Sequence, residues 1–431
     1  MPDPNIAIAI LLGSFLLMMF LGQRIALAMG ISAVLTTLYL EMPVQMIAIN
    51  LVKGAHVFVL QAVPFFVIAG ALMGEGGISN RLIVLSKALI GWMRGGLAMV
   101  NILASMFFGG ISGSASADTS SIGSIMIPMM KKDGYDGEFA TTVTMASSIQ
   151  GLLVPPSHNF VIFAMAAGGV SIGKLFMGGL VPGIFLGIAL MVYCYVFSVL
   201  RKYPKGDKFD LRFALKSTYD SSWGLLTVLI VVVGVVGGIF TATEAAAIAV
   251  IWSLFVTFVI YREIPLRSFF KILRTSLETL SIVMILIASA GAFGWLVAFL
   301  KIPALFASGI MALTSSKFVI LILINLLLLF LGTLTGMSAL IVIMTPILLP
   351  IVLEMGMDPV HFGVVMILNL GIGLITPPVG GVLFIGSAIS RIPIEKLSRA
   401  MIPFYLVMVS VLLAITYIPQ IVMTLPNLFY Q

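Results

Sequence analysis

The sequence predicts an all-α polytopic membrane protein whose two halves are repeats of opposite orientation in the membrane. Three observations lead to this fold class. Of the 431 residues, 61% are hydrophobic and only 9% are charged, and long apolar runs recur along the chain, as in helices that cross a bilayer. The dipeptide Pro-Pro occurs once in each half, within such a run. Lys and Arg concentrate in alternate connections between the runs.

The composition also argues against several function classes. Cys194 is the only cysteine, so no internal disulfide can form. No G-x-x-x-x-G-K-[ST] motif is present, so this chain is not expected to hydrolyse ATP through a P-loop. The net charge of +7 fits the asymmetric charge of a membrane protein better than nucleic-acid binding. Residues 5–21 have no basic flank before them, so we expect a permanent span rather than a signal peptide.

The first half contains one apolar stretch that differs from a simple crossing. Within residues 97–130 the polar sequence FFGGISGSASAD leaves two pieces that are each too short to cross alone. We therefore predict a re-entrant hairpin there, called hairpin one, which turns inside the protein. The predicted crossings of this half are 5–21, 25–40, 57–75, the broken helix 139–170 and the return helix 175–200.

A constant offset relates the two halves. Adding 222 to the numbers of Pro155 and Pro156 gives Pro377 and Pro378. One unchanging offset that links many punctuation residues indicates an internal duplication. The same offset pairs Glu41 with Glu263, Phe108 with Phe330, Gly110 with Gly332, Asp136 with Asp358 and Lys174 with Lys396.

The offset predicts the elements of the second half. They are crossings at 227–240, 247–261 and 279–297, hairpin two at 319–352, a broken helix at 361–392 and a last helix at 396–422. Repeat one is predicted to comprise scaffold and arm helices over 1–96, hairpin one and its broken helix over 97–170, the return helix over 175–200 and a cytoplasmic loop over 201–222. Repeat two, 223–431, is predicted to comprise scaffold and arm helices over 223–318, hairpin two and its broken helix over 319–392, and the last helix.

The positive-inside rule gives the orientation. An odd number of predicted crossings separates equivalent positions, so the repeats are expected to be inverted. With both termini outside, the only basic residues in outer connections are Lys53, Lys174, Lys301 and Lys317. Hairpin one then opens to the cytoplasm and hairpin two to the outside. The segments 41–54 and 263–276 are predicted to be amphipathic arm helices in the interface, with ordinary loop helices as the alternative.

The paired prolines interrupt a helix for a chemical reason. Proline lacks an N–H group and clashes with the carbonyl four residues earlier, so Pro155 and Pro156 free the carbonyls of Gly151 and Leu152. The first half-helix then ends in free carbonyl oxygens, which suit a hard cation. The second begins with free N–H groups, which suit a carboxylate. A plain kink capped by neighbouring hydroxyl groups is the alternative.

Two cation sites are predicted from these freed carbonyls, one in each half. The first lies between the tip of hairpin one and the first break, and is formed by Ser112, Gly113, Ser114, Gly151, Leu152 and Pro155, with Ser157 nearby. The second lies at the equivalent place in repeat two, and is formed by Gly332, Thr335, Gly373, Thr376 and Pro377.

An anion site is predicted between the two breaks, near the middle of the membrane. Its residues are Ser116, Asp118, Pro156, Ser157, His158, Asn159, Gly336, Pro378, Val379 and Gly380. Asp118 is an ionisable group at membrane depth, which is costly unless it has a function. Its alternative role is a helix N-cap within the hairpin. Glu244, by contrast, is expected to cap a helix start after Thr241 and Thr243.

These motifs together resemble one known family. FFGGISGSASADTSSIGSIMIP, GLLVPPSHNF, GIFTATEAAAIAV and GIGLITPPVGG are similar to the large membrane subunit of tripartite ATP-independent periplasmic (TRAP) transporters, over nearly the whole chain. The resemblance implies a Na⁺-driven secondary transporter of the bacterial inner membrane that works by an elevator mechanism. It implies two partners, a periplasmic substrate-binding protein and a small four-span membrane subunit on a separate chain. Family substrates are organic acids, including C4-dicarboxylates and sialic acid.

Three other function classes are alternatives to this family. A stand-alone elevator-type Na⁺/carboxylate symporter shares inverted repeats and hairpins but carries other tip motifs. An intramembrane enzyme would need a catalytic set at one depth, and none is found, since His56, His158 and His361 are scattered and lack metal spacing. A channel is disfavoured by the apolar spans and by the unequal acid content of the two hairpins. We therefore expect a transporter subunit and no enzyme.

Overall fold

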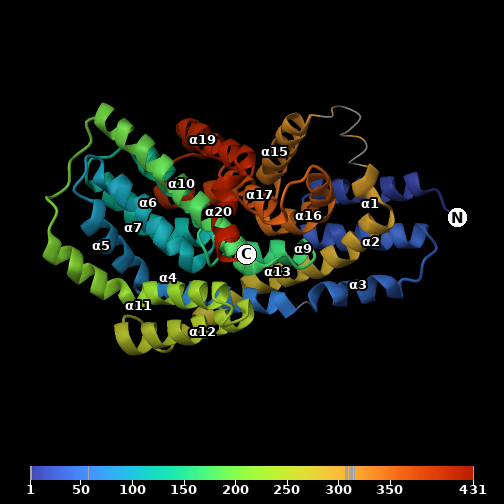
Figure 1. Ribbon diagram of the computed structural model, residues 1–431, viewed down its shortest axis with the longest axis horizontal. Coiled ribbons are helices and arrows are strands. Elements are labelled where there is room, and N and C mark those ends of the chain that lie inside the picture. Colours follow the sequence, from blue (N-terminus) through green and yellow to red (C-terminus); the bar gives the residue numbers. More distant parts are fainter. Residues whose placement is uncertain (1, 57, 306–308, 310–313, 315, 431) are drawn as a thin grey trace.

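The structure is a computed structural model that describes residues 2–56, 58–305, 309, 314 and 316–430. Its regular elements are all helices (Figure 1), and the described residues contain no β-strand. Within that part of the chain, seven helices are long and apolar enough to cross a membrane, or eight if the bent pair α4–α5 counts as one span. The predicted class of an all-α polytopic membrane protein is confirmed.

The first half contains eleven helical elements among the described residues. In order these are α1 (Pro4–Phe20), α2 (Ile25–Tyr39), α3 (Gln45–Ala55), the 3-10 helix η1 (Phe58–Gln61), α4 (Ala62–Glu75), α5 (Ile78–Ile90), α6 (Gly96–Ser112), α7 (Ala115–Lys132), α8 (Gly137–Gln150), α9 (His158–Ala166) and α10 (Ile172–Leu200). Hairpin one is the pair α6–α7, and the first break separates α8 from α9. The pair α4–α5 bends by 68° at Gly76 and Gly77.

The second half follows the same order. Its elements are α11 (Leu211–Val236), α12 (Ala242–Phe255), the π-helix η2 (Val256–Tyr261), α13 (Ser268–Phe299), α15 (Lys317–Leu334), α16 (Met337–Glu354), α17 (Pro359–Leu374), α18 (Gly381–Ser390), α19 (Ile394–Tyr417) and α20 (Pro419–Phe429). Hairpin two is the pair α15–α16, and the second break separates α17 from α18. Adding 222 to the bounds of α7, 115–132, gives 337–354, the bounds of α16. This agreement supports the predicted duplication, and the inversion of the two halves stays a prediction.

The structure corrects three predicted boundaries. Residues 201–222 are not a loop throughout, because α11 begins at Leu211, where the Asp210 side chain accepts a hydrogen bond from the Arg212 N–H at 2.8 Å. The predicted boundary at 222/223 therefore falls inside α11. The first turns of α11 were missed because they carry charged residues and have no apolar run. The crossing expected at 227–240 ends at Val236.

The other two corrections concern α13 and the C-terminus. The arm 263–276 and the crossing 279–297 form one continuous helix, α13, because no proline or glycine separates them. The last predicted helix, 396–422, ends at Tyr417, and Pro419 starts the separate helix α20.

Helices α15 and α16 each have 18 residues and are long enough to cross by themselves, so length alone does not identify hairpin two as re-entrant.

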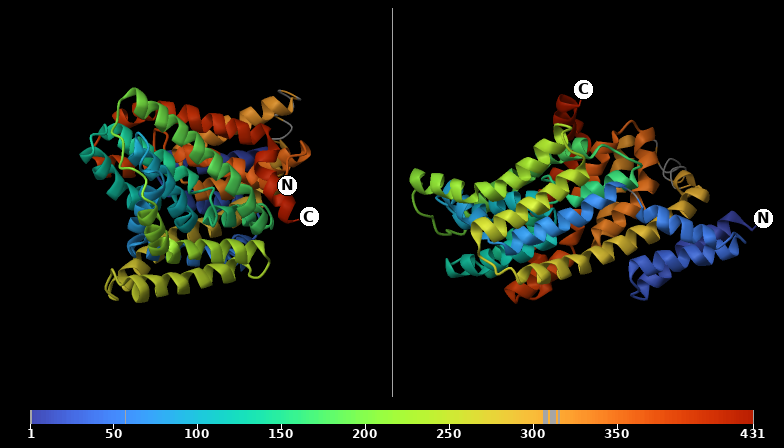
Figure 2. Two further views of the ribbon diagram at one scale, coloured as in Figure 1. Left: turned by 60° about the vertical axis from the view of Figure 1, so that its left-hand side comes forward. Right: turned by 90° about the horizontal axis from the view of Figure 1, so that it is seen from below.

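Helices α8 and α17 form the centre of the molecule. From Phe139 to Gln150 every residue of α8 is buried, and so is every residue of α17 from Val360 to Gly373. The hairpins and the helices α10 and α19 pack around them. Figures 1 and 2 show the ribbon from three sides. The helices α1, α2 and α3 extend at one end of the molecule, and α11 and α12 lie side by side at another. The two broken helices are therefore held inside the protein.

The connection between α10 and α11 is fixed against the base of hairpin one. The N–H of Gly95 donates to the carbonyl of Pro204 at 3.0 Å, and the Tyr203 hydroxyl donates to the Asp136 carboxylate at 2.6 Å. Burial, followed by the hydrogen bond to Asp136, raises the pKa of Tyr203 above its usual value. The tyrosine therefore stays neutral and keeps its proton for Asp136.

Candidate functional site

Hairpin one and the first break meet at backbone distance. A Cβ added to Gly109 would lie 2.1 Å from the Gly151 Cα, and one added to Gly113 would lie 3.0 Å from the Ser157 Cα. The first contact requires glycine, since a real Cβ essentially never approaches another atom that closely, and Gly113 has a left-handed backbone with φ +58° that favours glycine. The side-chain amide of Asn159 donates to the carbonyl of Gly113 at 3.1 Å. The structure thus brings the predicted residues of the first cation site together.

The first break is buried and carries oxygen atoms without hydrogen-bond partners. Residues 151–157 are all buried. Among the described residues, no backbone donor reaches the carbonyls of Gly151 or Leu152, which agrees with their release by the prolines. The Ser157 hydroxyl and Nδ1 of His158 also lack partners. Since buried polar atoms are normally satisfied, these oxygens fit a bound cation.

Asp118 is the most unusual of these side chains. The N-cap of α7 is Ser114, whose hydroxyl accepts from the Ala117 N–H at 3.3 Å, so the alternative of Asp118 as an N-cap is wrong. The Asp118 side chain lies in the first turn of α7, is only 1% exposed, and neither carboxylate oxygen makes a hydrogen bond. The Ser105 hydroxyl lies nearby but bonds to Ser147 at 3.0 Å. An ionisable side chain buried at membrane depth without a hydrogen bond is a candidate functional residue.

The second break also meets its hairpin at backbone distance, but through a different hydrogen bond and with a different exposure. A Cβ added to Gly373 would lie 2.5 Å from the carbonyl carbon of Gly332, and the Val379 N–H donates to the Thr333 carbonyl at 3.2 Å. The Thr335 hydroxyl is buried without a partner. The Gly373 carbonyl, however, accepts from the Thr376 N–H at 3.0 Å, so it is not free as predicted, although its second lone pair remains available.

Exposure separates the two breaks further. Pro377, Pro378 and Val379 are exposed, whereas the equivalent residues of the first break are buried. Among the remaining predicted anion-site residues, Ser116 and Gly336 are exposed and Gly380 is buried. No hydrogen bond within the described part of the chain joins residues 157–159 to residues 379–381. The structure therefore assembles each break with its own hairpin, and it does not join the two predicted anion-binding segments directly.

The two halves nevertheless interlock. Helix α7 of hairpin one packs on α18, and helix α16 of hairpin two packs on α9. Under the offset α7 corresponds to α16, and α9 to α18, so the two contacts are equivalent. Each hairpin thus contacts the half-helix that follows the break in the other half. This reciprocal packing holds the four pieces as one block.

A polar ladder inside the first half was missed by the sequence analysis. The Asn101 amide of α6 donates to the Thr144 hydroxyl of α8 at 2.6 Å, and Gln150 donates to the Ile102 carbonyl. In the second half, the Asn369 amide donates to the side chain of Asn325 at 2.7 Å. The signal in the sequence was the run of Ser and Thr in α8, which is unusual for a fully buried helix.

Glu244 and the histidines lie outside the predicted cation sites. Glu244 caps α12 as expected, since it forms a reciprocal capping box with Thr241. His361 bonds to the Ile415 carbonyl at 2.6 Å, and His56 ends α3. Among the residues that the structure describes, no three His, Cys, Asp or Glu side chains cluster as metal ligands. A cation at either break would therefore depend on carbonyl and hydroxyl oxygens, which suit a hard ion.

We expect Asn159→Ala to weaken the apparent affinity for the coupling cation several-fold, because the variant loses the side-chain bond between the break and the tip carbonyl of Gly113. The measurement is the half-saturating cation concentration in a liposome uptake assay. Asn427→Ala, an exposed asparagine of α20, is the matched control. An unchanged half-saturation in Asn159→Ala would show that this bond does not shape the site.

Two helical hairpins, each packed against a broken helix, are typical of a membrane transporter subunit. Comparison with known proteins makes this specific. Residues 12–421 match the family described as tripartite ATP-independent periplasmic transporter, DctM component. The chain therefore belongs to this family of large permease proteins of TRAP transporters.

Individual relatives agree with the family. The chain is 39% identical to the C4-dicarboxylate TRAP transporter large permease protein DctM of Pseudomonas aeruginosa, covering 93% of this chain and 94% of that one. It is 40% identical to the sialic acid TRAP transporter large permease protein SiaM of Vibrio cholerae, covering 88% and 89%. Among solved structures, the YdaH transporter of Alcanivorax borkumensis has a similar fold, with a TM-score of 0.63, 15% identity and 86% of each chain covered.

Proposed function

We propose that this protein imports an organic acid across the bacterial inner membrane, driven by a Na⁺ gradient. The observation that carries the proposal is the buried first break, where the carbonyls of Gly151 and Leu152 and the hydroxyl of Ser157 have no partner in the described structure. Na⁺ is a hard cation for which such oxygens are suitable ligands. The family assignment and the names of the relatives support an organic acid as substrate.

Two Na⁺ sites are proposed, one at each break. The first would be held by the carbonyls of Gly151 and Leu152 together with the tip of hairpin one. The second would use the hydroxyl of Thr335, which is buried without a partner. The substrate carboxylate would lie at the N-terminus of α9, where the helix dipole stabilises an anion by roughly 0.3–2 kcal/mol. This modest energy suits a transporter, which has to release what it binds.

The moving part is proposed to be the interlocked block of both hairpins and both broken helices, sliding as an elevator against the remaining helices. The contacts of α7 with α18 and of α16 with α9 support this division. The description of the family as tripartite supports two partners, a periplasmic substrate-binding protein and a small membrane subunit. Both termini are proposed to face the periplasm, because the basic residues then lie mainly inside.

The test is uptake into proteoliposomes that contain this chain with its small subunit. Accumulation of a C4-dicarboxylate or of sialic acid is expected only when a Na⁺ gradient and the matching substrate-binding protein are both present. Uptake by the isolated chain would instead indicate a stand-alone symporter. Uptake that follows a proton gradient and ignores Na⁺ would contradict the cation sites.

A further inference from the structure

The ion pair between Arg81 and Glu263 joins the two halves of the chain. Nη1 of Arg81, on α5, lies 2.5 Å from Oε1 of Glu263, in the connection between η2 and α13. Among the described residues the one other ion pair is Arg274–Glu278, which lies within α13 and is highly exposed. Arg81–Glu263 is therefore the ion pair of this part of the structure that fixes separate elements to each other.

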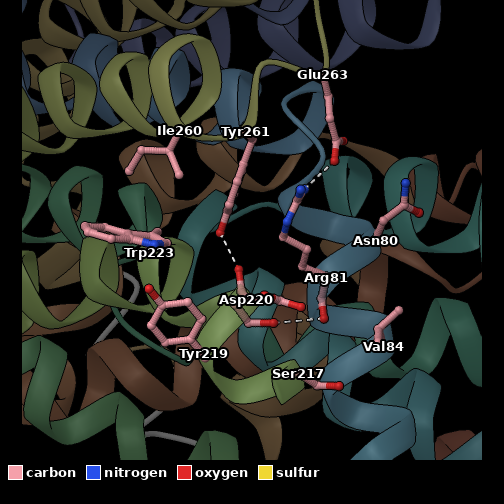
Figure 3. A pocket seen from close by; sticks show the side chains of 11 residues that line it. Asn80, Arg81, Val84, Ser217, Tyr219, Asp220, Trp223, Ile260, Tyr261 and Glu263 are labelled. Carbon is pink, nitrogen blue, oxygen red and sulfur yellow. Dashed lines mark hydrogen bonds and ion pairs between the residues drawn. The ribbon is translucent and has the colours of Figure 1, made fainter. Parts of the chain in front are cut away.

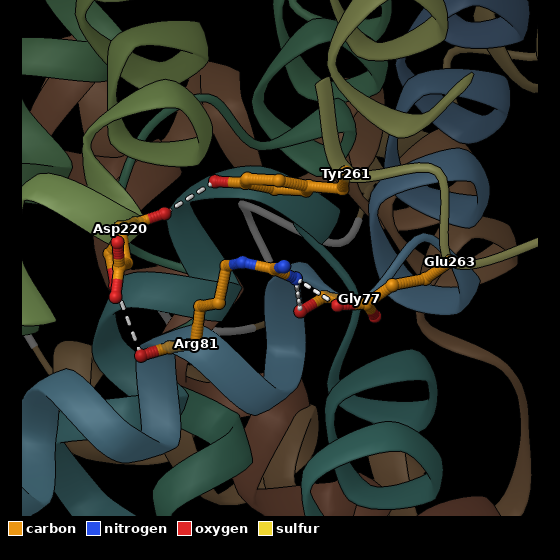
Figure 4. Close-up of polar contacts among 6 residues, drawn as sticks. Gly77, Arg81, Asp220, Tyr261 and Glu263 are labelled. Carbon is orange, nitrogen blue, oxygen red and sulfur yellow. Dashed lines mark hydrogen bonds and ion pairs between the residues drawn. The ribbon is translucent and has the colours of Figure 1, made fainter. Parts of the chain in front are cut away.

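Besides the ion pair, Arg81 takes part in three contacts at this place (Figure 4). Its guanidinium group lies 3.6 Å from the centre of the Tyr261 ring, and Nη1 also donates to the carbonyl of Gly77 at 3.0 Å. The Ser221 hydroxyl of α11 donates to the carbonyl of Arg81 at 3.0 Å. Tyr261 in turn donates to the carbonyl of Asp220 at 2.7 Å. This one arginine of α5 thus contacts the N-cap of its own helix, α11, η2 and the connection to α13.

The backbone of Gly77 makes room for this arrangement. It has φ +81°, and a Cβ there would overlap the carboxylate of Glu263. The bend between α4 and α5 thus places the carbonyl of Gly77 and the carboxylate of Glu263 on the same guanidinium group. Any side chain at Gly77 would push Glu263 away, in addition to straining the backbone.

Glu263 of the ion pair lines two cavities, one of which is drawn in Figure 3. A cavity of about 700 Å³ is lined by Arg81 and Glu263 together with Tyr219, Trp223 and Tyr261. A second, of about 480 Å³, is lined by Glu263 and by serines of α7, namely Ser120, Ser121 and Ser124. Glu263 therefore lines both cavities and shares the second one with α7.

The helices that meet at Arg81 lead to both hairpins. Helix α5 packs against α6, the first helix of hairpin one, and against α11. Helix α13, which begins five residues after Glu263, packs against α16 of hairpin two and against α3. A displacement of Glu263 relative to α5 would therefore change how the helices around the block contact the two hairpins.

We infer that Arg81 is a positioning residue for transport. By holding Glu263 and Tyr261, it fixes the start of α13 against α5. The contact of α5 with hairpin one and the contact of α13 with hairpin two then keep the same relative position while the block moves. The residue touches neither the predicted cation sites nor the predicted anion site. Its loss is expected to slow turnover and to leave substrate affinity unchanged. This inference rests on the proposed transport function.

The experiment compares Arg81→Gln, Arg81→Lys and Glu263→Gln in the reconstituted transporter, at matched amounts of protein in the membrane. The two Gln variants are expected to lower the maximal uptake rate by roughly 5-fold or more, as breaking a coupling contact does, with KM for substrate and for Na⁺ changed less than about twofold. Arg81→Lys is expected to keep most of the rate, because it preserves the charge and the cation–π contact. Arg274→Gln, which breaks the exposed pair, is the matched control and should behave as wild type.

A second measurement needs no transport. In the purified protein, the unfolding midpoints of Arg81→Gln, Glu263→Gln and the double variant should be non-additive, because both single changes break the same contact. Additive midpoints would overturn the pair itself. An unchanged maximal rate in Arg81→Gln would overturn the positioning role. So would a KM for substrate that rises by the same factor as the maximal rate falls. If the wild type shows no uptake, the proposed function fails, whereas the non-additivity still tests the contact.

Discussion

Asp118→Asn is expected to abolish uptake while leaving the protein at least as stable as the wild type. The Asp118 carboxylate is buried and has no hydrogen-bond partner, and such a group costs several kcal/mol when it is charged. A neutral amide of the same shape removes most of that cost. It also removes a carboxyl group of the predicted substrate site, so stability and activity should change in opposite directions.

The measurements are the initial rate of uptake in proteoliposomes and the thermal unfolding midpoint of the purified protein. Asp133→Asn, an exposed carboxylate at the other end of the same helix, is the control for loss of one charge. If Asp118→Asn transports at the wild-type rate, Asp118 has no role in binding. If the variant is strongly destabilised, the carboxylate has a structural partner after all.

Gly151→Ala is expected to lower Na⁺-dependent uptake about 10-fold or more, because overpacking a close contact costs about 1–3 kcal/mol. The new Cβ would lie 2.6 Å from the Cα of Gly109, and ordinary contacts begin at 3.4 Å. The Cα of Gly109 belongs to the backbone, so no flexible side chain can move aside. The tip of hairpin one would have to separate from the freed carbonyls of the first break.

Gly294→Ala provides the matched control, since a Cβ at this glycine of α13 meets nothing within 4 Å. It should keep wild-type uptake and membrane level. Gly373→Ala makes the equivalent change at the second break, where the added Cβ would lie 2.5 Å from Gly332, and should reduce uptake as well. Wild-type Na⁺ dependence in Gly151→Ala would mean that the contact between hairpin and break is not part of the cation site.

The two breaks differ in burial and in the partners of their carbonyl groups, and this difference affects the expected cation affinity of the two proposed sites. The first break is buried, whereas Pro377, Pro378 and Val379 are exposed. The Gly373 carbonyl has a donor in Thr376, whereas the Gly151 carbonyl has none among the described residues. The two proposed cation sites are therefore not expected to have equal affinity, and the first site has more unpaired oxygen atoms.

The sequence by itself determined the class of the fold, the positions of both breaks and the residues of each hairpin tip. These features depend on local chemistry: a proline has no N–H to donate, and an apolar run of sufficient length belongs in a bilayer. The same locality explains the errors. The start of α11 carries charges and no apolar run, so hydropathy predicted a loop there. In α13 hydropathy predicted a boundary between arm and crossing, although no residue at that junction breaks a helix.

Only the tertiary structure decided which of these groups have partners. Identical Pro-Pro pairs ended up buried in one half and exposed in the other, because burial depends on which helices pack over each break. Ser114, not Asp118, caps α7, and this choice depends on the backbone geometry of the hairpin tip. The contact of Arg81 with Glu263 joins residues far apart in the sequence, where no spacing rule applies, because their distance is set by the packing of α5, α11 and α13.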